Sequence, residues 1–462
     1  MISPRATPQM IRHIQELVRK KLPRGSFARA VSILAGGTAL TQALAVLASP
    51  VLTRLYSVED FGYFQMYMAF MAFAALAVTL RYEQAIFLPE KEEVAANLVI
   101  VTICTVLAMS VFFGFLAWAV HRYGVLPNSA AGLRPYVGLV PFAICGAGIY
   151  QTLSIWALRQ KAYSHVTRTR VTQVGSQIAI QTGMGVLHAG TLGLFVGDAI
   201  GRVAGSLSLA RLAWHRDRSA FKFAKWKTIW SAAVRYRHFP FVSSGAALMG
   251  VAAYSLPPLL MAQLYGARTL GWFALGDRAL GVPAILVGQA VAQVYSVEAS
   301  SLNVSNPAAF HRLFLRSMKR LLWLGLVPFL IFVLFGPALF GFVFGASWRE
   351  AGVYARWLAP MHYVALVAGP LTPTLNILEK QFWQLGWDVG RLVLTVGSLW
   401  LTYRWGWSAR SAIAAFGAVV SVGYAFHLLI SHYAIKERVR QFDAAKPTLP
   451  LVSAEYAGSG KL

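Results

Sequence analysis

Apolar runs of about 20 residues follow one another along almost the whole chain, separated by short polar or charged segments. A helix of about 20 apolar residues spans the hydrocarbon core of a bilayer. The runs cover twelve ranges, which are 30–53, 62–80, 94–120, 135–158, 168–188, 191–213, 240–262, 270–296, 318–342, 352–378, 382–403 and 411–435. In lipid only helices or closed barrels satisfy their backbone, and the sequence lacks the alternating segments of a barrel. We therefore expect an all-α polytopic membrane protein of about twelve transmembrane helices.

The distribution of charged residues agrees with these predicted spans. The chain carries 42 Lys and Arg against 17 Asp and Glu, a formal net charge of +25, which in a soluble protein would suggest nucleic acid. With the N-terminus inside, most of the basic residues fall on one side of the predicted helices, as the positive-inside rule requires of the cytoplasmic side. We therefore expect both termini in the cytoplasm and no nucleic-acid partner.

Polar segments divide the chain further. Residues 1–26 have the pattern of an amphipathic helix on the membrane surface, or of a basic leader that only fixes topology. Residues 214–239 mix basic and aromatic side chains, which is typical of an interfacial cytoplasmic linker. The predicted domains are therefore a leader, an N-terminal lobe over 27–213, this linker, a C-terminal lobe over 240–436, and a cytoplasmic tail over 437–462.

Two segments of the chain match at a constant offset. Residues 56–64 read Tyr-Ser-Val-Glu-Asp-Phe-Gly-Tyr-Phe, and residues 265–273 read Tyr-Gly-Ala-Arg-Thr-Leu-Gly-Trp-Phe. Each segment lies between the first and second span of its half, and prolines precede both, at Pro50 and at Pro257-Pro258. Such a parallel repeat is typical of transporters. We expect two pseudo-symmetric six-helix lobes around a central cavity.

Four arginines lie inside the predicted spans, at Arg202, Arg278, Arg356 and Arg391. A charge at the centre of the bilayer costs about 2.5–3.5 kcal/mol, so each needs a partner, water or a role. Nearby acids are Asp198, Asp277 and Asp388. One explanation for Asp198 with Arg202 and for Asp388 with Arg391 is a local ion pair that merely permits insertion into the membrane.

Such pairs do not explain Arg356, which has no acid nearby in sequence, or the excess of cations over acids. The alternative is a cationic cavity for an anionic headgroup, because the guanidinium fork binds phosphate oxygens bidentately and stays charged.

The range 168–188 is the most polar of the twelve. Arg170, Gln173, Gln177 and Gln181 recur at helical spacing, so that they form one stripe. Amide side chains can bind sugar hydroxyls or a neighbouring helix, and both alternatives stay open. In the next range Gly197, Gly201 and Gly205 favour close helix packing.

The segment from Pro50 to Phe64, Pro-Val-Leu-Thr-Arg-Leu-Tyr-Ser-Val-Glu-Asp-Phe-Gly-Tyr-Phe, and the segment Leu-Arg-Tyr-Glu-Gln-Ala-Ile from Leu80 resemble the opening of known proteins. These are the bacterial polysaccharide flippases of the multidrug/oligosaccharidyl-lipid/polysaccharide exporter superfamily, in which a proline is more frequent at the position of Val58. The resemblance implies a V-shaped exporter of the bacterial inner membrane.

In function, the resemblance implies translocation of undecaprenyl-diphosphate-linked oligosaccharide units from the cytoplasmic to the periplasmic leaflet. The products are surface polysaccharides such as lipopolysaccharide or exopolysaccharide, and the mechanism is alternating access. Arg54, Arg81 and Glu83 become candidate binding residues on this ground.

We therefore expect a transporter and not an enzyme, without catalytic residues, cofactor or metal. The predicted residues for the diphosphate and sugar are Arg54, Arg81, Glu83, Arg170, Gln173, Gln177, Arg202, Arg278, Arg356 and Arg391. Those for ion coupling are Asp198, Asp277 and Asp388. The expected partners are a polyprenyl-diphosphate-linked glycan, membrane lipids, and polymerase or chain-length proteins of the same pathway. The alternatives are a multidrug exporter, which would prefer an acidic cavity, and a lipid-linked glycosyltransferase or polymerase.

Overall fold

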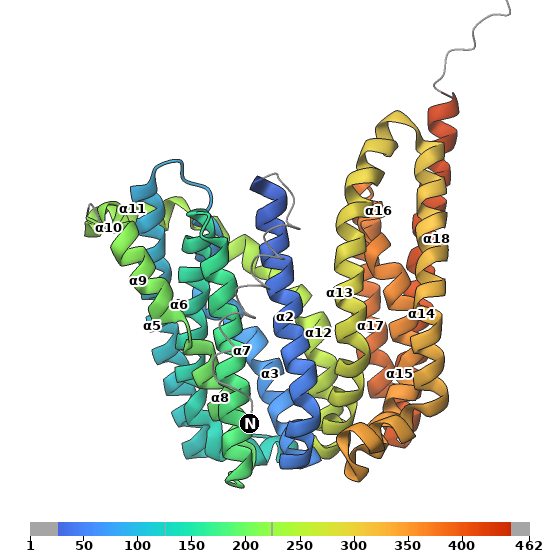
Figure 1. Cartoon of the computed structure of the whole chain (residues 1–462), viewed down its shortest axis with the longest axis horizontal. Helices are drawn as coiled ribbons and strands as arrows, with labels where there is room; N and C mark the ends of the chain where they lie inside the picture. The colour runs from blue at the N-terminus through green and yellow to red at the C-terminus, as the bar shows by residue number, and fades with distance from the viewer. Residues whose placement is uncertain (1–25, 125, 223–224, 445–462) are drawn as a thin grey trace, which may run out of the picture. The chain divides into compact units, whose positions relative to one another are not determined.

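The computed structural model describes residues 26–124, 126–222 and 225–444, and within these ranges the chain forms helices and short connections without a β-strand (Figure 1). The predicted all-α fold is confirmed. The leader predicted over 1–26, apart from Ser26, and the tail beyond residue 444 lie outside the described residues.

Helices cover the predicted ranges, although the ranges 191–213 and 352–378 are each divided between separate helices. The first half contains α2 (Ser26–Leu55), α3 (Val58–Thr79), α4 (Tyr82–Ala85), α5 (Glu92–Tyr123), the 3-10 helix η1 (Asn128–Leu139), α6 (Val140–Arg159), α7 (Tyr163–Val186), α8 (Thr191–Val203) and α9 (Ser206–Arg216). The middle contains α10 (Arg218–Phe221), α11 (Trp226–Arg235), the π-helix η2 (Phe239–Ser243), α12 (Ser244–Tyr265) and α13 (Ala267–Ser305). The remainder contains α14 (Pro307–Phe344), η3 (Ala346–Trp348), α15 (Arg349–Ala368), η4 (Gly369–Leu371), α16 (Pro373–Ile377), α17 (Gln381–Arg404) and α18 (Ala409–Ala444).

Nine of the described helical segments are long and apolar enough to cross a membrane. The other three predicted spans correspond to α7, α15 and α17, which carry more polar residues. Helices α13 and α14 are longer than their predicted spans, with 39 and 38 residues. The chain is a multi-pass membrane protein.

The first repeated segment forms the turn between α2 and α3. Ser57 and Asp60 close a capping box there: the Asp60 amide donates to Ser57 Oγ at 3.1 Å, and the Ser57 amide donates to Asp60 Oδ2 at 3.0 Å. This pairing satisfies amides that the first helical turn leaves open. The Thr191 hydroxyl donates to the other Asp60 oxygen and so ties the start of α8 to the same turn.

The described residues fall into two compact units. The first, which we call unit 1, contains the residues up to 282 together with 332–358 and 395–415. The second, unit 2, contains 283–331, 359–394 and the residues from 416 onward. The division into two six-span lobes on either side of 214–239 stays a prediction.

Unit 1 has an apolar core made by α3, α5, α6 and α8, to which Met71, Val106, Ile144 and Phe195 belong. The predicted linker over 214–239 is itself largely helical and packs on this unit. Ala232 of α11 is buried, and the Tyr82 hydroxyl donates to the carbonyl of the neighbouring residue, Ala233, at 3.0 Å.

Candidate functional site

The Arg202 side chain forms the ion pair that its spacing from Asp198 predicts. Arg202 Nε lies 2.5 Å from Asp198 Oδ2, and the Tyr67 hydroxyl donates to the same oxygen at 2.9 Å. Asp198 is only 3 % exposed, so its charge is balanced by Arg202 within the helix bundle. In this structure the Arg202 guanidinium is therefore bound to a carboxylate of the protein itself.

The polar stripe of α7 faces α8. Gln173 Nε2 donates to the carbonyl of Arg202 at 2.9 Å, and Gln181 Nε2 donates to another α8 carbonyl at 3.0 Å. A Cβ on Gly201 would lie 2.8 Å from Gln177 Cβ, so the glycines of α8 allow α7 to approach closely. These contacts favour the helix-packing alternative for the glutamines. Arg170 is half-buried on the same helix.

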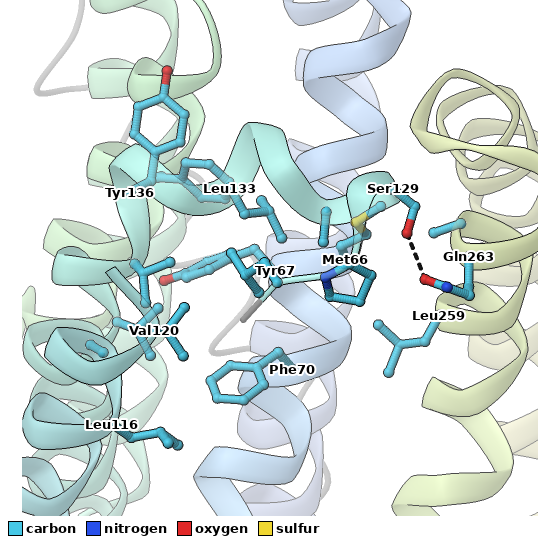
Figure 2. Close-up of a pocket in the computed structure, with 18 of the residues that line it drawn as sticks. Met66, Tyr67, Phe70, Leu116, Val120, Ser129, Leu133, Tyr136, Leu259 and Gln263 are labelled. Atoms are coloured by element: carbon cyan, nitrogen blue, oxygen red, sulfur yellow. Dashed lines mark hydrogen bonds between the residues drawn. The ribbon is translucent and has the colours of Figure 1, made fainter. Parts of the chain in front are cut away.

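An apolar cavity of about 450 Å³ lies in unit 1, beside Tyr67 (Figure 2). Its walls come from α3, α5, η1, α8 and α12, with side chains such as Phe70 and Leu259. At one edge the Ser129 hydroxyl donates to Gln263 Oε1 at 2.6 Å, as the dashed line in Figure 2 shows. Among the described residues, no Lys, Arg, Asp or Glu lines this cavity, so its chemistry suits hydrocarbon and not a diphosphate.

Arg278 and Arg356 have different surroundings. Arg356 Nη2 donates to the Leu334 carbonyl at 3.3 Å, and the side chain is half-buried. The Arg278 side chain is exposed, and it makes no hydrogen bond or ion pair with the part of the chain that the structure describes. Asp277, the preceding residue, is half-buried. Of these two arginines, Arg278 is the one available to a ligand.

Unit 2 contains a groove of about 440 Å³ between α17 and α18, and Arg391 lines it. Trp383, Trp387 and Arg391 follow at steps of four along α17, so they share one face. Val422 and Phe426 of α18 form the opposite wall. Arg391 Nη1 donates to the Tyr424 hydroxyl at 3.1 Å, which holds the guanidinium in place. We call this site the α17/α18 groove.

Glycines leave the groove open, and a group of polar residues lies beside it. A Cβ on Gly386 or Gly390 would meet nothing within 4 Å, which leaves the face of α17 open between its large side chains. On a neighbouring face of α17, Gln384 Nε2 donates to Asp388 Oδ2 at 3.2 Å, and Gln384 Oε1 lies 3.2 Å from His427 Nε2. Asp388 is exposed.

The sequence prediction of this site named Arg391 and Asp388 but missed both tryptophans. Their spacing, with aromatic residues four and eight positions before an in-membrane arginine and glycines between them, was the available signal. Tryptophans near helix ends are common as interface anchors, so spacing alone does not separate the two uses.

The residues that the family resemblance adds lie in unit 1. Arg54 is exposed near the end of α2, whereas Arg81 and Glu83 follow the far end of α3. Leu80 and Arg81 both have left-handed backbone, with φ of 46° and 63°, which costs about 1–3 kcal/mol for each non-glycine residue. Strain of this size is retained where the surrounding structure fixes a conformation. Glu83, two residues after Arg81, is buried.

Sequence comparison identifies the family. The model of a family described as polysaccharide biosynthesis protein matches residues 51–352. No curated protein matches the chain in sequence.

Solved structures show the fold. An inward-facing multidrug resistance MATE family transporter of the MOP superfamily aligns at a TM-score of 0.66 with 15% identity, over 88% of this chain and 96% of its own. The lipid II flippase MurJ in an inward closed conformation aligns at 0.64 with 10% identity, over 88% and 90%. A MOP superfamily transporter from Pyrococcus furiosus aligns at 0.54 with 15% identity, over 90% and 96%. The chain therefore belongs to the polysaccharide biosynthesis protein family, as its opening motif indicated, and has the fold of MOP superfamily transporters.

Proposed function

We propose that this protein transports an anionic lipid-linked glycan across the membrane, and that the α17/α18 groove binds part of that substrate. The observation that carries the proposal is the position of Arg391, a cation inside a groove that is otherwise built from aromatic, aliphatic and glycine residues. Membership of a polysaccharide biosynthesis family agrees with a glycan as cargo.

Each part of the groove suits one part of such a substrate. The Arg391 guanidinium can bind two phosphate oxygens at once, and a phosphate can replace water around a desolvated arginine more readily than a neutral group can. Indole faces pack against the apolar faces of sugar rings, for which Trp383 is suitably exposed. Val422, Phe426 and Leu394 offer aliphatic and aromatic surface to the first isoprene units.

The finer proposal is an undecaprenyl-diphosphate-linked oligosaccharide, moved from the cytoplasmic to the periplasmic leaflet of the bacterial inner membrane by alternating access. Solved relatives of this fold include inward-facing and outward-facing forms, and one of them is a lipid II flippase, which supports both the mechanism and the substrate class. Arg278 is the second cation that we propose for the headgroup, because its side chain is exposed.

For ion coupling we propose Asp388 ahead of Asp198, because Asp388 is exposed whereas Arg202 already neutralises Asp198. Asp277 stays a further candidate. Arg54, Arg81, Arg170 and Arg356 stay proposed contacts of the substrate along its path. Gln173 and Gln177 were also predicted as contacts, but their packing against α8 makes them weaker candidates.

The test replaces Arg391 in a strain whose own copy of the gene is deleted. We expect Arg391→Ala to reduce surface polysaccharide at least tenfold at normal protein levels, and Arg391→Lys to retain an intermediate level, because a lysine keeps the charge without the fork. Arg404→Ala is the matched control, since Arg404 is an exposed arginine of the same helix outside the groove. Wild-type export by Arg391→Ala would refute the assigned role of the groove.

A further inference from the structure

Glu83 is a buried acid that forms no ion pair within the described part of the chain. Its side chain is 1 % exposed, and no ion pair joins it to any residue in 26–124, 126–222 or 225–444. One oxygen, Oε1, accepts a hydrogen bond from Gln151 Nε2 at 3.2 Å. The other, Oε2, is buried and has no hydrogen-bond partner. An uncompensated buried carboxylate is strongly destabilising, so the site calls for a positive charge.

Neighbouring arginines do not supply that charge. The Arg159 guanidinium donates to the carbonyls of Ile86, Phe87 and Pro89 at 3.0, 3.2 and 2.6 Å, which holds the α4 connection on α6. The Arg81 side chain forms no ion pair with Glu83, although only one residue separates them in sequence. Its Nε atom is itself buried without a hydrogen-bond partner.

Two further buried oxygen atoms, Asn97 Oδ1 and Ser154 Oγ, also lack hydrogen-bond partners. Both side chains are 6 % exposed. Ser154 lies three residues after Gln151, so the two share one face of α6, the face that meets Glu83.

The register of α5 against α6 places Asn97 at the same level. Gln160 Nε2 donates to Glu92 Oε1 at 3.4 Å, and a Cβ on Gly148 would lie 2.7 Å from the Val106 side chain. The two helices are therefore antiparallel. Asn97, five residues after Glu92, lies opposite residue 155, five residues before Gln160 and next to Ser154.

We propose that Glu83, Gln151, Asn97 and Ser154 form a binding site for one sodium ion. Oxygen atoms are the ligands that hard cations prefer. A single carboxylate balances a single positive charge, whereas protein sites for Ca²⁺ usually combine several carboxylates. The carboxylate, amide and hydroxyl oxygens would surround the ion with groups that otherwise have unsatisfied atoms. The strained backbone at Leu80 and Arg81 directly precedes Glu83 in the chain. This site is separate from the α17/α18 groove.

The test measures thermal unfolding of the purified full-length protein without any glycan. Sodium chloride replaces choline chloride at constant ionic strength, with potassium chloride as a third series. We expect the midpoint to rise by about 2 °C or more for each tenfold increase in sodium beyond the dissociation constant, with a smaller response to potassium. Binding of radioactive sodium, measured directly, is expected to give one ion per chain.

Variants locate the site. We expect Glu83→Gln to lose the sodium response and, in choline, to be at least as stable as wild type, because it removes an uncompensated charge. Ser154→Ala is expected to shift the response to about tenfold higher sodium, and Glu93→Gln, an exposed acid at the start of α5, to behave as wild type.

A wild-type midpoint that is equal in sodium and choline overturns the proposal. The charge of Glu83 would then be balanced by Arg81 or removed by a proton. A sodium response that persists in Glu83→Gln overturns it as well. Neither result bears on Arg391, since no glycan is present in the experiment.

Discussion

Gly62 and Gly271, which occupy equivalent positions in the two repeated segments, pack reciprocally on each other's helix. A Cβ on Gly62 would lie 1.8 Å from the carbonyl oxygen of Ala267, and a Cβ on Gly271 would lie 2.0 Å from that of Val58. Val58 and Ala267 are themselves equivalent, each four residues before its glycine. The contact therefore has local two-fold symmetry, and the repeated glycine is explained by the crossing of α3 and α13.

Alanine at either glycine is expected to destabilise the protein. A methyl group cannot occupy the space of a backbone oxygen, so Gly62→Ala or Gly271→Ala must separate the two helices, at a cost of about 3 kcal/mol. The thermal midpoint of the purified protein should fall in both variants. Gly36→Ala is the control, because an added Cβ there meets nothing within 4 Å and alanine favours a helix. Equal midpoints for all three variants would contradict the close crossing.

The Asp198–Arg202 pair makes a second prediction about stability. Asp198→Asn leaves the half-buried Arg202 without its carboxylate and should lower the free energy of unfolding by about 3 kcal/mol. The double variant Asp198→Asn with Arg202→Met should recover much of this loss, since it removes both charges. Asp388→Asn, at an exposed acid that accepts a hydrogen bond from the Gln384 amide, should change the thermal midpoint little. A double variant that is no more stable than the single one would refute the pair's role.

Trp383 tests how the groove distinguishes sugar from phosphate. If its indole packs on a sugar ring, Trp383→Leu should weaken binding of a polyprenyl-diphosphate-linked glycan by about tenfold. This corresponds to about 1.4 kcal/mol of binding free energy. Binding of polyprenyl phosphate without sugar should stay unchanged. Equilibrium binding to the purified protein measures both. Trp400→Leu serves as control, because Trp400 is exposed on the same helix but lies outside the groove; an equal loss in this variant would argue against a sugar contact.

Asp217, which follows α9, predicts a pH dependence. Burial raises the pKa of its carboxyl above the ordinary 3.8, although the hydrogen bond from Trp156 Nε1, at 2.9 Å, opposes this. A raised folded-state pKa means that this group's contribution to stability is present in acid and is lost as pH rises through that pKa. Asp217→Asn keeps an acceptor for Trp156 and cannot ionise. The difference between the thermal midpoints of the variant and the wild type should therefore increase in favour of the variant as pH rises above 3.8, and then stay constant. A difference that decreases with rising pH would contradict the raised pKa.

The helices could be read from the sequence because a bilayer leaves the backbone almost no other conformation. Even α7 was predicted, although Gln173 and Gln181 make it polar. Its amides bond to α8, a contact that hydropathy cannot reveal. The ends of α13 and α14 were missed because both helices continue beyond their apolar spans; α14 begins with a basic stretch that includes Arg312 and Arg316.

The candidate site was less predictable, because it depends on which helices become neighbours. Four in-membrane arginines looked alike in the sequence, yet Arg202 is neutralised by Asp198, and Arg391 shares a groove with Trp383 and Trp387. Glu83 became a candidate only through the family resemblance, and no sequence pattern indicated its hydrogen-bond partner Gln151, 68 residues away. Local spacing predicted the intrahelical pair correctly and could not predict contacts between helices.

The most direct test of the transport function uses the purified protein in proteoliposomes. Transfer between leaflets is measured for a short glycan on a polyprenyl diphosphate and for the same glycan on an uncharged polyprenyl carrier. The account predicts at least tenfold faster transfer of the anionic lipid than in protein-free vesicles, little transfer of the neutral one, and a return to background with Arg391→Ala. Equal transfer of both lipids by the wild-type protein, or unchanged transfer by Arg391→Ala, would contradict it.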